Sequence, residues 1–134
     1  MADTFEIEIV TPEKLVVKDV ADEAQIPGKT GYLGILPGHA PLISELAVGE
    51  ITYKTSGVTK HISVAWGFAE VLPNKVTILA ETAERPDEID VARAQKAKER
   101  CERELNSGAT DIDYDAVQAA LERAETRIDV AKKQ

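Results

Sequence analysis

Alternation of apolar and polar residues marks the first part of the chain. Residues 5–10, Phe-Glu-Ile-Glu-Ile-Val, place an apolar side chain at every second position, which is the period of a strand with one buried and one wet face. Further runs that read as strands, bounded by turn residues such as glycine and proline, span residues 15–20, 23–27, 49–55, 58–65, 67–72 and 75–80. The pattern therefore predicts short strands joined by tight turns.

The stretch from Gly31 to Ile43 lies at the centre of this region. It combines three glycines and two prolines with large aliphatic residues. We interpret it as two short buried strands joined by a bend at Pro37 and Gly38. With these included, about nine short strands occupy the first ~84 residues, which favours an antiparallel sandwich or a flattened barrel.

A different pattern begins at Arg85, where alanine becomes frequent and apolar residues recur at steps of three or four. This spacing is typical of amphipathic helices. We predict a first helix over residues 88–105, capped by Asp87, and a second helix that begins near Asp113. Residues 106–108, Asn-Ser-Gly, separate the two helices, so we expect them to form an antiparallel hairpin.

The apolar face of each predicted helix is rich in alanine. The residues on these faces are Ala94, Ala97, Cys101 and Leu105 in the first helix, and Val117, Ala120, Leu121, Ala124, Ile128 and Ala131 in the second. Burying a methyl group contributes on the order of 1 kcal/mol, whereas a leucine contributes roughly two or three times as much. We therefore divide the chain into a strand domain, residues 1–84, and a helical domain, residues 85–134, whose hairpin is weakly held and can open.

Composition narrows the class of protein. The chain carries a net charge of −8 and has an isoelectric point near 4.8, which argues against nucleic acid or anionic lipid as its main partner. Cys101 is the single cysteine, so no internal disulfide can form, which fits a reducing compartment. Because the chain has neither a signal-like N-terminus nor a run of roughly 18 apolar residues, we expect a soluble protein that binds other proteins.

Candidate catalytic and metal-binding groups have little support. Residues 28–30, Gly-Lys-Thr, end like a phosphate-binding P-loop, but Glu23 stands where that motif needs a glycine, so a turn with a solvated lysine is preferred. His39 and His61 lack the partners and the spacing of a metal site, and His39 is interpreted as a hydrogen-bonded loop residue. The alternative in the enzyme class is a small hydrolase that uses Glu84 or His39.

Three segments together resemble one protein family. Residues 31–43, GYLGILPGHAPLI, resemble the signature G-x-L-G-I-L-P-G-H-A-P-L of the epsilon subunit of the bacterial F-type ATP synthase, which is called delta in mitochondria. Residues 66–84 resemble its G-G-F-x-E-V-x-P-x-x-V-T-I-L-A segment, with Trp66 in place of the usual glycine. Residues 89–94, IDVARA, resemble the opening of its first helix, and the likeness extends over the full chain.

The resemblance implies a ten-stranded antiparallel β-sandwich followed by a two-helix antiparallel hairpin. It implies a non-catalytic rotor subunit of the central stalk, which turns with gamma and the c-ring and couples proton flow to ATP synthesis at the cytoplasmic face of the bacterial plasma membrane. Neither a cofactor nor a metal is implied as a requirement. The residues expected to meet gamma and the c-ring are Gly31, Tyr32, Leu33 and His39.

The resemblance also implies regulation by the hairpin. The hairpin would unfold, extend along gamma to the alpha and beta subunits and block ATP hydrolysis, and in some bacterial members bound ATP keeps it folded. The residues that match the ATP-binding positions of those members are Glu84, Ile89, Asp90, Arg93, Ala94, Arg100, Arg123 and Arg127. Arginines on both helices can hold a triphosphate only while the hairpin is closed.

Two alternatives remain open from the sequence. Asp90 and Arg93 are three residues apart on the predicted helix, and this spacing alone favours a surface ion pair worth roughly a few tenths of a kcal/mol. The alternative in a different functional class is a free-standing β-sandwich module that binds nucleotides.

Overall fold

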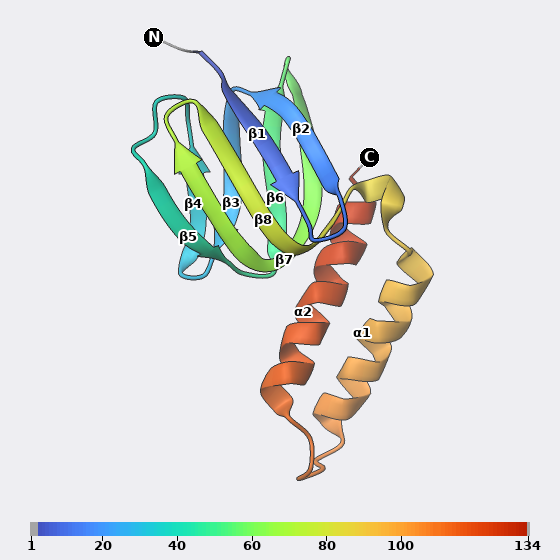
Figure 1. The fold of residues 1–134 in the computed structure, drawn as a ribbon. Helices are drawn as coiled ribbons and strands as arrows, with labels where there is room; N and C mark the ends of the chain where they lie inside the picture. The colour runs from blue at the N-terminus through green and yellow to red at the C-terminus, as the bar shows by residue number, and fades with distance from the viewer. Residues whose placement is uncertain (1–2, 134) are drawn as a thin grey trace.

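Strands formed by the alternating runs make up the first part of the molecule (Figure 1). The computed structural model describes residues 3–133, and within them it holds eight strands. In chain order these are β1 (Phe5–Val10), β2 (Leu15–Ala21), β3 (Glu23–Gly28), β4 (Gly31–Ile35), β5 (Leu42–Leu46), β6 (Gly49–Thr55), β7 (Val58–Leu72) and β8 (Lys75–Glu84). Two helices follow them, so the prediction of a β-sandwich followed by a helical hairpin is confirmed.

The expected count of ten strands is wrong, and so is the count of nine from the pattern, because β7 is continuous. It pairs with β6 over residues 58–64 and with β5 over residues 67–71. Between these stretches Trp66 has a φ of 52° and Gly67 a φ of 124°, so the strand bends there instead of turning back. A Cβ on Gly67 would lie 1.9 Å from the carbonyl oxygen of Leu79, so only glycine fits at this bend.

The strands form one continuous sheet that folds over into two layers (Figure 1). Its hydrogen-bonded order is β2-β1-β8-β7-β5-β3-β4, and β6 pairs with both β3 and β7. The pairs are antiparallel except for β1 and β8, which run parallel. The expectation that every strand pair is antiparallel is therefore wrong for β1 and β8. Because β1 and β8 are far apart in sequence, no hairpin turn constrains their relative direction.

The interior between the two layers is mainly aliphatic, since aromatic residues make up only 4% of the chain. Its best-buried side chains are Ile7, Ile9, Val17, Ile26, Ile35, Ile51, Val64, Val71, Val76 and Ile78. In β1 they occupy alternate positions, because successive side chains of a strand point to opposite faces of the sheet. Full burial of one such side chain contributes about 1.5–3 kcal/mol. Most of the apolar stabilisation of the chain therefore lies in the sandwich.

β4 and β5 flank the bend at Pro37 and Gly38, as predicted, but they are not buried strands. Within them only Ile35 and Leu46 have buried side chains. Large side chains of this region that are exposed to solvent are Tyr32 (60%), Leu36 (62%) and Ile43 (71%). β4 pairs with β3, while β5 pairs mainly with β7. Most side chains of β4 and β5 are exposed, so the prediction that the two strands are buried is wrong.

The first helix, α1 (Val91–Asn106), begins three residues later than predicted. Asp90, and not Asp87, caps it, because the Asp90 carboxylate accepts a backbone N–H of the first turn at 3.1 Å. The preceding residues Pro86–Glu88 form a 3₁₀ turn of their own, and Ile89 is extended. The α-helix can start only after this extended residue.

The second helix, α2 (Tyr114–Ala131), begins where it was predicted. The side chain of Asp113 accepts the backbone N–H of Ala116 at 3.1 Å and so caps the helix. α1 and α2 lie side by side and antiparallel (Figure 1). Among the described residues, neither helix combines the length and the apolar character needed to cross a membrane.

The packing between the two helices is as light as predicted. The predicted face residues that are buried on the helices are Ala94, Cys101, Leu121, Ala124, Ile128 and Ala131. The others are only partly buried, namely Ala97, Leu105, Val117 and Ala120. Four of these six buried side chains are alanine or cysteine, each of which contributes little free energy, and Leu121 and Ile128 are the two large ones.

The hairpin meets the sandwich mainly through the last turns of α2 (Figure 1). A small apolar cluster at this junction consists of Ile89, Val130 and Ala131. Two ion pairs flank it: Arg127 Nε donates to Glu84 Oε1 at 2.6 Å, and Lys133 Nζ donates to Glu50 Oε2 at 2.7 Å. Because partly exposed ion pairs contribute about 1 kcal/mol or less, we infer that the hairpin is docked weakly.

Glu50 in β6 joins the end of α2 to the sandwich and also contacts His61 of β7. Its carboxylate lies 2.6 Å from His61 Nδ1 and 2.7 Å from Lys133 Nζ. Burial alone would raise the pKa of Glu50, but the hydrogen bonds and charges of Lys133 and His61 outweigh burial and lower that pKa below 4.5. Such a carboxylate stabilises the folded state above its unfolded pKa, and this stabilisation is lost as pH falls through the lower, folded pKa.

Replacing Glu50 by glutamine should therefore loosen the docking of α2 at neutral pH. In urea titrations the free energy of unfolding of Glu50→Gln should fall by less than about 1 kcal/mol, because Lys133 is 46% exposed. The difference from the parent should shrink as pH is lowered from neutral to about pH 3. Glu45→Gln is the control, since its partner Lys29 lies outside the hairpin. A difference that stays constant over this pH range would contradict the linkage.

Candidate functional site

A pocket between α1 and α2 gathers most of the residues predicted to bind ATP. It has a volume of about 150 Å³. We call it the arginine pocket, and its lining residues are Glu84, Asp90, Arg93, Ala94, Ala97, Arg100, Ala120, Arg123, Ala124 and Arg127. Of the predicted residues only Ile89 is not part of this lining, because its side chain packs in the apolar cluster with Val130 and Ala131.

Helical spacing explains why residues so far apart in the chain come together. Residues three, four or seven positions apart lie on the same side of a helix. In α2 the lining residues Ala120, Arg123, Ala124 and Arg127 have this spacing, and those of α1 follow the same rule from Arg93 to Arg100. The alanines let the two helices approach closely, while the arginines are long enough to reach around the space between them.

The charges of the arginine pocket are only partly balanced. Arg127 is paired with Glu84 at 2.6 Å. Within residues 3–133, Arg93 and Arg100 make no ion pair, and the guanidinium of Arg123 lies 5.3 Å from the centre of the Trp66 ring. Guanidinium groups without a carboxylate partner bind phosphates well, because their planar N–H donors match phosphate oxygens. The pocket can therefore hold a polyanion.

Asp90 has a structural role that its spacing from Arg93 did not reveal. Its Oδ1 accepts the backbone N–H of Arg93 at 3.1 Å and caps α1. No ion pair between the two side chains is present in the described part of the chain. The surface ion pair favoured by spacing alone is therefore wrong, because the carboxylate is used by the helix N-terminus.

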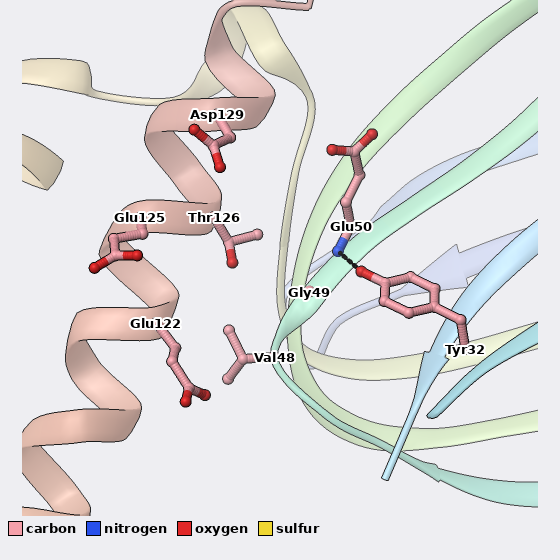
Figure 2. A pocket seen from close by; sticks show the side chains of 8 residues that line it. All are labelled: Tyr32, Val48, Gly49, Glu50, Glu122, Glu125, Thr126 and Asp129. Carbon is pink, nitrogen blue, oxygen red and sulfur yellow. Dashed lines mark hydrogen bonds between the residues drawn. The ribbon is translucent and has the colours of Figure 1, made fainter. Parts of the chain in front are cut away.

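A second pocket lies between α2 and the sandwich and has the opposite charge. Figure 2 shows its lining residues, which are Tyr32, Val48, Gly49, Glu50, Glu122, Glu125, Thr126 and Asp129. We call it the acidic pocket; its volume is about 300 Å³. Four carboxylates around this space disfavour a phosphate ligand. Of the two pockets beside α2, the arginine pocket is therefore the candidate anion site.

The residues predicted to meet gamma and the c-ring are divided between the two ends of β4: Gly31 and Tyr32 lie at the turn from β3, and His39 lies in the bend after the other end, where Gly38 donates to the carbonyl oxygen of Pro73. Gly31, Tyr32 and Leu33 belong to β4, and Leu33 packs partly against the core. The Tyr32 hydroxyl accepts the backbone N–H of Glu50 at 3.2 Å (Figure 2). The ring Nδ1 of His39 lies 2.7 Å from the carbonyl oxygen of Ala40, which confirms its interpretation as a hydrogen-bonded loop residue.

An apolar patch on the outer face of the sheet was missed by sequence reasoning. Phe68 of β7 lies opposite Leu79 of β8, and Leu79 is in register with Val10 of β1. Phe68 is 53% exposed and Leu79 is 55% exposed. Adjacent exposed apolar side chains often mark a protein–protein contact. The available signal was that apolar residues occupy positions 68 and 79, where the alternation of a one-sided strand calls for polar residues.

Comparison with known proteins covers both halves of the chain. The family model described as the β-sandwich domain of the ATP synthase delta/epsilon chain matches residues 4–86. The model described as the long α-helix domain of the same chain matches residues 87–132.

Similar proteins with curated names carry the same designation. The "ATP synthase epsilon chain" of Koribacter versatilis is 71% identical over 111 residues, which are 83% of this chain and 78% of that protein. The protein of the same name from Solibacter usitatus is 47% identical over 133 residues, 99% of each chain. That of Nitratidesulfovibrio vulgaris is 48% identical over 130 residues, 97% of each chain.

Two solved structures share the fold. A chain of the Euglena gracilis mitochondrial ATP synthase matches with a TM-score of 0.82 at 21% identity, over 98% of this chain and 83% of that one. A chain of the Tetrahymena thermophila mitochondrial ATP synthase matches with a TM-score of 0.57 at 15% identity, over 96% and 94%. Family models that span nearly the whole chain and close relatives thus agree: the chain belongs to the delta/epsilon family of ATP synthase subunits.

Proposed function

We propose that this chain is a rotor subunit of the central stalk of a proton-translocating F-type ATP synthase, where it couples proton flow to ATP synthesis and restrains ATP hydrolysis. Its place would be the cytoplasmic face of the bacterial plasma membrane, as a peripheral subunit. The observation that carries the proposal is the combination of a firmly packed sandwich, exposed apolar surfaces and a weakly docked hairpin in one member of this family. Membership of the family argues against the alternative of a free-standing nucleotide-binding module.

Two exposed surfaces of the sandwich are suited to the proposed partners. The first comprises β4 and the bend that follows it, with Gly31, Tyr32, Leu33 and His39 and the exposed Leu36. The second is the apolar patch of Phe68 and Leu79. We assign these surfaces to contacts with the c-ring and with gamma. The two structural relatives come from assemblies that include the c-ring and, for Tetrahymena, the central stalk, which supports this assignment by analogy of fold.

Inhibition is assigned to the hairpin because its attachment is weak. Apart from the small cluster of Ile89, Val130 and Ala131, polar contacts supply most of the docking. Residues 91–131 would reach on the order of 60 Å as one continuous helix at about 1.5 Å per residue. We propose that the hairpin opens, extends along gamma to the alpha and beta subunits and blocks ATP hydrolysis.

ATP sensing is assigned to the arginine pocket. Arginines from both helices converge on a space that exists only while α1 and α2 lie together. A ligand that binds only the closed form shifts the population towards it. ATP supplies the polyanion that Arg93, Arg100 and Arg123 lack, and we assign Glu84, which also lines the pocket, to the adenine side of the ligand. ATP would then be a regulatory ligand that keeps the hairpin closed, and not a required cofactor.

Removal of the hairpin should release ATP hydrolysis. The truncated chain should retain every residue up to Glu88. Arg85 then keeps its hydrogen bonds to the carbonyl oxygen of Val16, and the sandwich stays intact. In the reconstituted synthase, the hydrolysis rate should rise about twofold if half of the molecules carry the inhibitory extended form. ATP-driven proton pumping, measured in the same vesicles, reports whether docking survives. Unchanged hydrolysis with intact pumping would remove the inhibitory role.

Calorimetric titration of the isolated chain with ATP tests the pocket. Arg93→Ala should weaken binding about 10- to 100-fold, because a charge-assisted hydrogen bond is lost. Asp90→Asn keeps the helix cap and so separates ligand contact from helix stability. Arg103→Ala is the matched control, since Arg103 lies on α1 outside the arginine pocket. Absence of heat with the parent at millimolar ATP would end the nucleotide proposal.

A further inference from the structure

One aromatic contact joins the sandwich to the middle of α2. Trp66, the only tryptophan of the chain, lies in β7. The guanidinium carbon of Arg123 lies over its ring, 5.3 Å from the ring centre. A cation at this distance over an indole face is attracted by the negative face of the ring. The contact is separate from the two ion pairs of Arg127 and Lys133, which lie nearer the end of α2.

The backbone at Trp66 is in an unusual conformation. Its φ of 52° lies in the left-handed region, which bulky residues rarely adopt and which glycine enters freely. The next residue, Gly67, must be glycine because of the carbonyl of Leu79, but no such restriction explains a tryptophan at position 66. Unfavourable backbone conformations persist where the surrounding contacts compensate for them. The ring of Trp66 makes one such contact, with Arg123.

Arg123 is placed to serve two surfaces at once. A cation–π contact uses the charge of the guanidinium, so the N–H donors that do not face the ring stay available. The same side chain lines the arginine pocket and has no carboxylate partner within the described residues. The contact therefore restricts the rotamers of Arg123 without occupying all of its hydrogen-bond donors, which reduces the entropy that a phosphate ligand must remove.

We propose that Trp66 is a positioning residue for Arg123: its ring holds the guanidinium at the rim of the arginine pocket and fastens the middle of α2 to the sandwich. We call this contact the aromatic latch. Its effect on nucleotide affinity rests on the proposed function of the arginine pocket, whereas its effect on hairpin docking does not. Because both effects act through one side chain, nucleotide binding and hairpin docking reinforce each other.

The docking effect is tested without nucleotide. Trp66→Asn removes the ring but keeps a residue that tolerates positive φ, and Arg123→Ala removes the cation at little cost in helix propensity. Amide hydrogen exchange of residues 121–128 in the full chain should be about two- to fivefold faster in either variant. Exchange in the double variant should be no faster than in either single variant, since the second change has no contact left to remove.

Two further variants separate the latch from a general loss of structure. Trp66→Phe should restore slow exchange in part, because phenylalanine retains an aromatic face. Arg103→Ala, on the exposed side of α1, should leave the exchange of residues 121–128 unchanged. The amides of β1 and β8 should exchange at the parent rate in every variant. Additive effects of Trp66→Asn and Arg123→Ala, or exchange in Trp66→Asn equal to that of the parent, would overturn the latch.

The positioning effect is tested by titrating the same variants with ATP. Trp66→Asn should bind ATP about two- to fivefold more weakly than the parent, Trp66→Phe should recover part of the loss, and Trp66 emission of the parent should change on saturation. Equal affinities of Trp66→Asn and the parent would overturn positioning while the proposed function stands. If titration of the parent with ATP gives no heat, the proposals of nucleotide sensing and of positioning are both wrong. The exchange experiment still decides whether the latch fastens α2 to the sandwich.

Discussion

The packing of isoleucine and valine side chains between the two layers of the sandwich is the interaction on which the rest of the structure depends. Residues such as Ile7, Ile51 and Ile78 are fully buried there, whereas three alanines and one cysteine are four of the seven buried residues of the helices. This unequal division of apolar burial gives the chain a rigid part that can bind partners and a loosely attached part that can move. A hairpin with a leucine-rich seam would be too stable to open readily.

Charge replaces apolar burial where the hairpin meets its surroundings. One side of α2 presents arginines to the pocket it shares with α1, and another side presents carboxylates to the sandwich (Figure 2). Lys133 at its end is held by Glu50. Polar contacts of this kind are weakened by salt and pH and strengthened by a ligand of matching charge. The docking of the hairpin is therefore adjustable, which a regulatory element requires.

Local patterns in the sequence predicted most of the elements, because strand alternation and helical spacing depend on near neighbours. They placed the cap at Asp113 correctly, but they could not distinguish Asp87 from Asp90, since the choice depends on the 3₁₀ turn at Pro86–Glu88. The bend of β7 was read as a break between two strands. Only the change of its pairing partner from β6 to β5 shows that the strand continues.

The candidate site was more predictable than the surfaces. Seven residues that family resemblance singled out line one pocket, because helical spacing places each set on one side of its helix. The contact of Trp66 with Arg123 and the pairing of Phe68 with Leu79 join residues distant in the chain. The first has no local signal, since it arises from the way the hairpin docks on the sandwich, whereas the second left only a break in the strand alternation at positions 68 and 79.

The central claim is that the hairpin rests closed on the sandwich and that ATP holds it there. It is tested most directly by the distance between spin labels at Thr59→Cys on β7 and Gln118→Cys on α2, in assembled synthase with the buried Cys101 replaced by alanine. With saturating ATP the account predicts one narrow population of short distances. Removal of ATP should add a second population of longer distances. An identical distance distribution in both conditions would contradict the account.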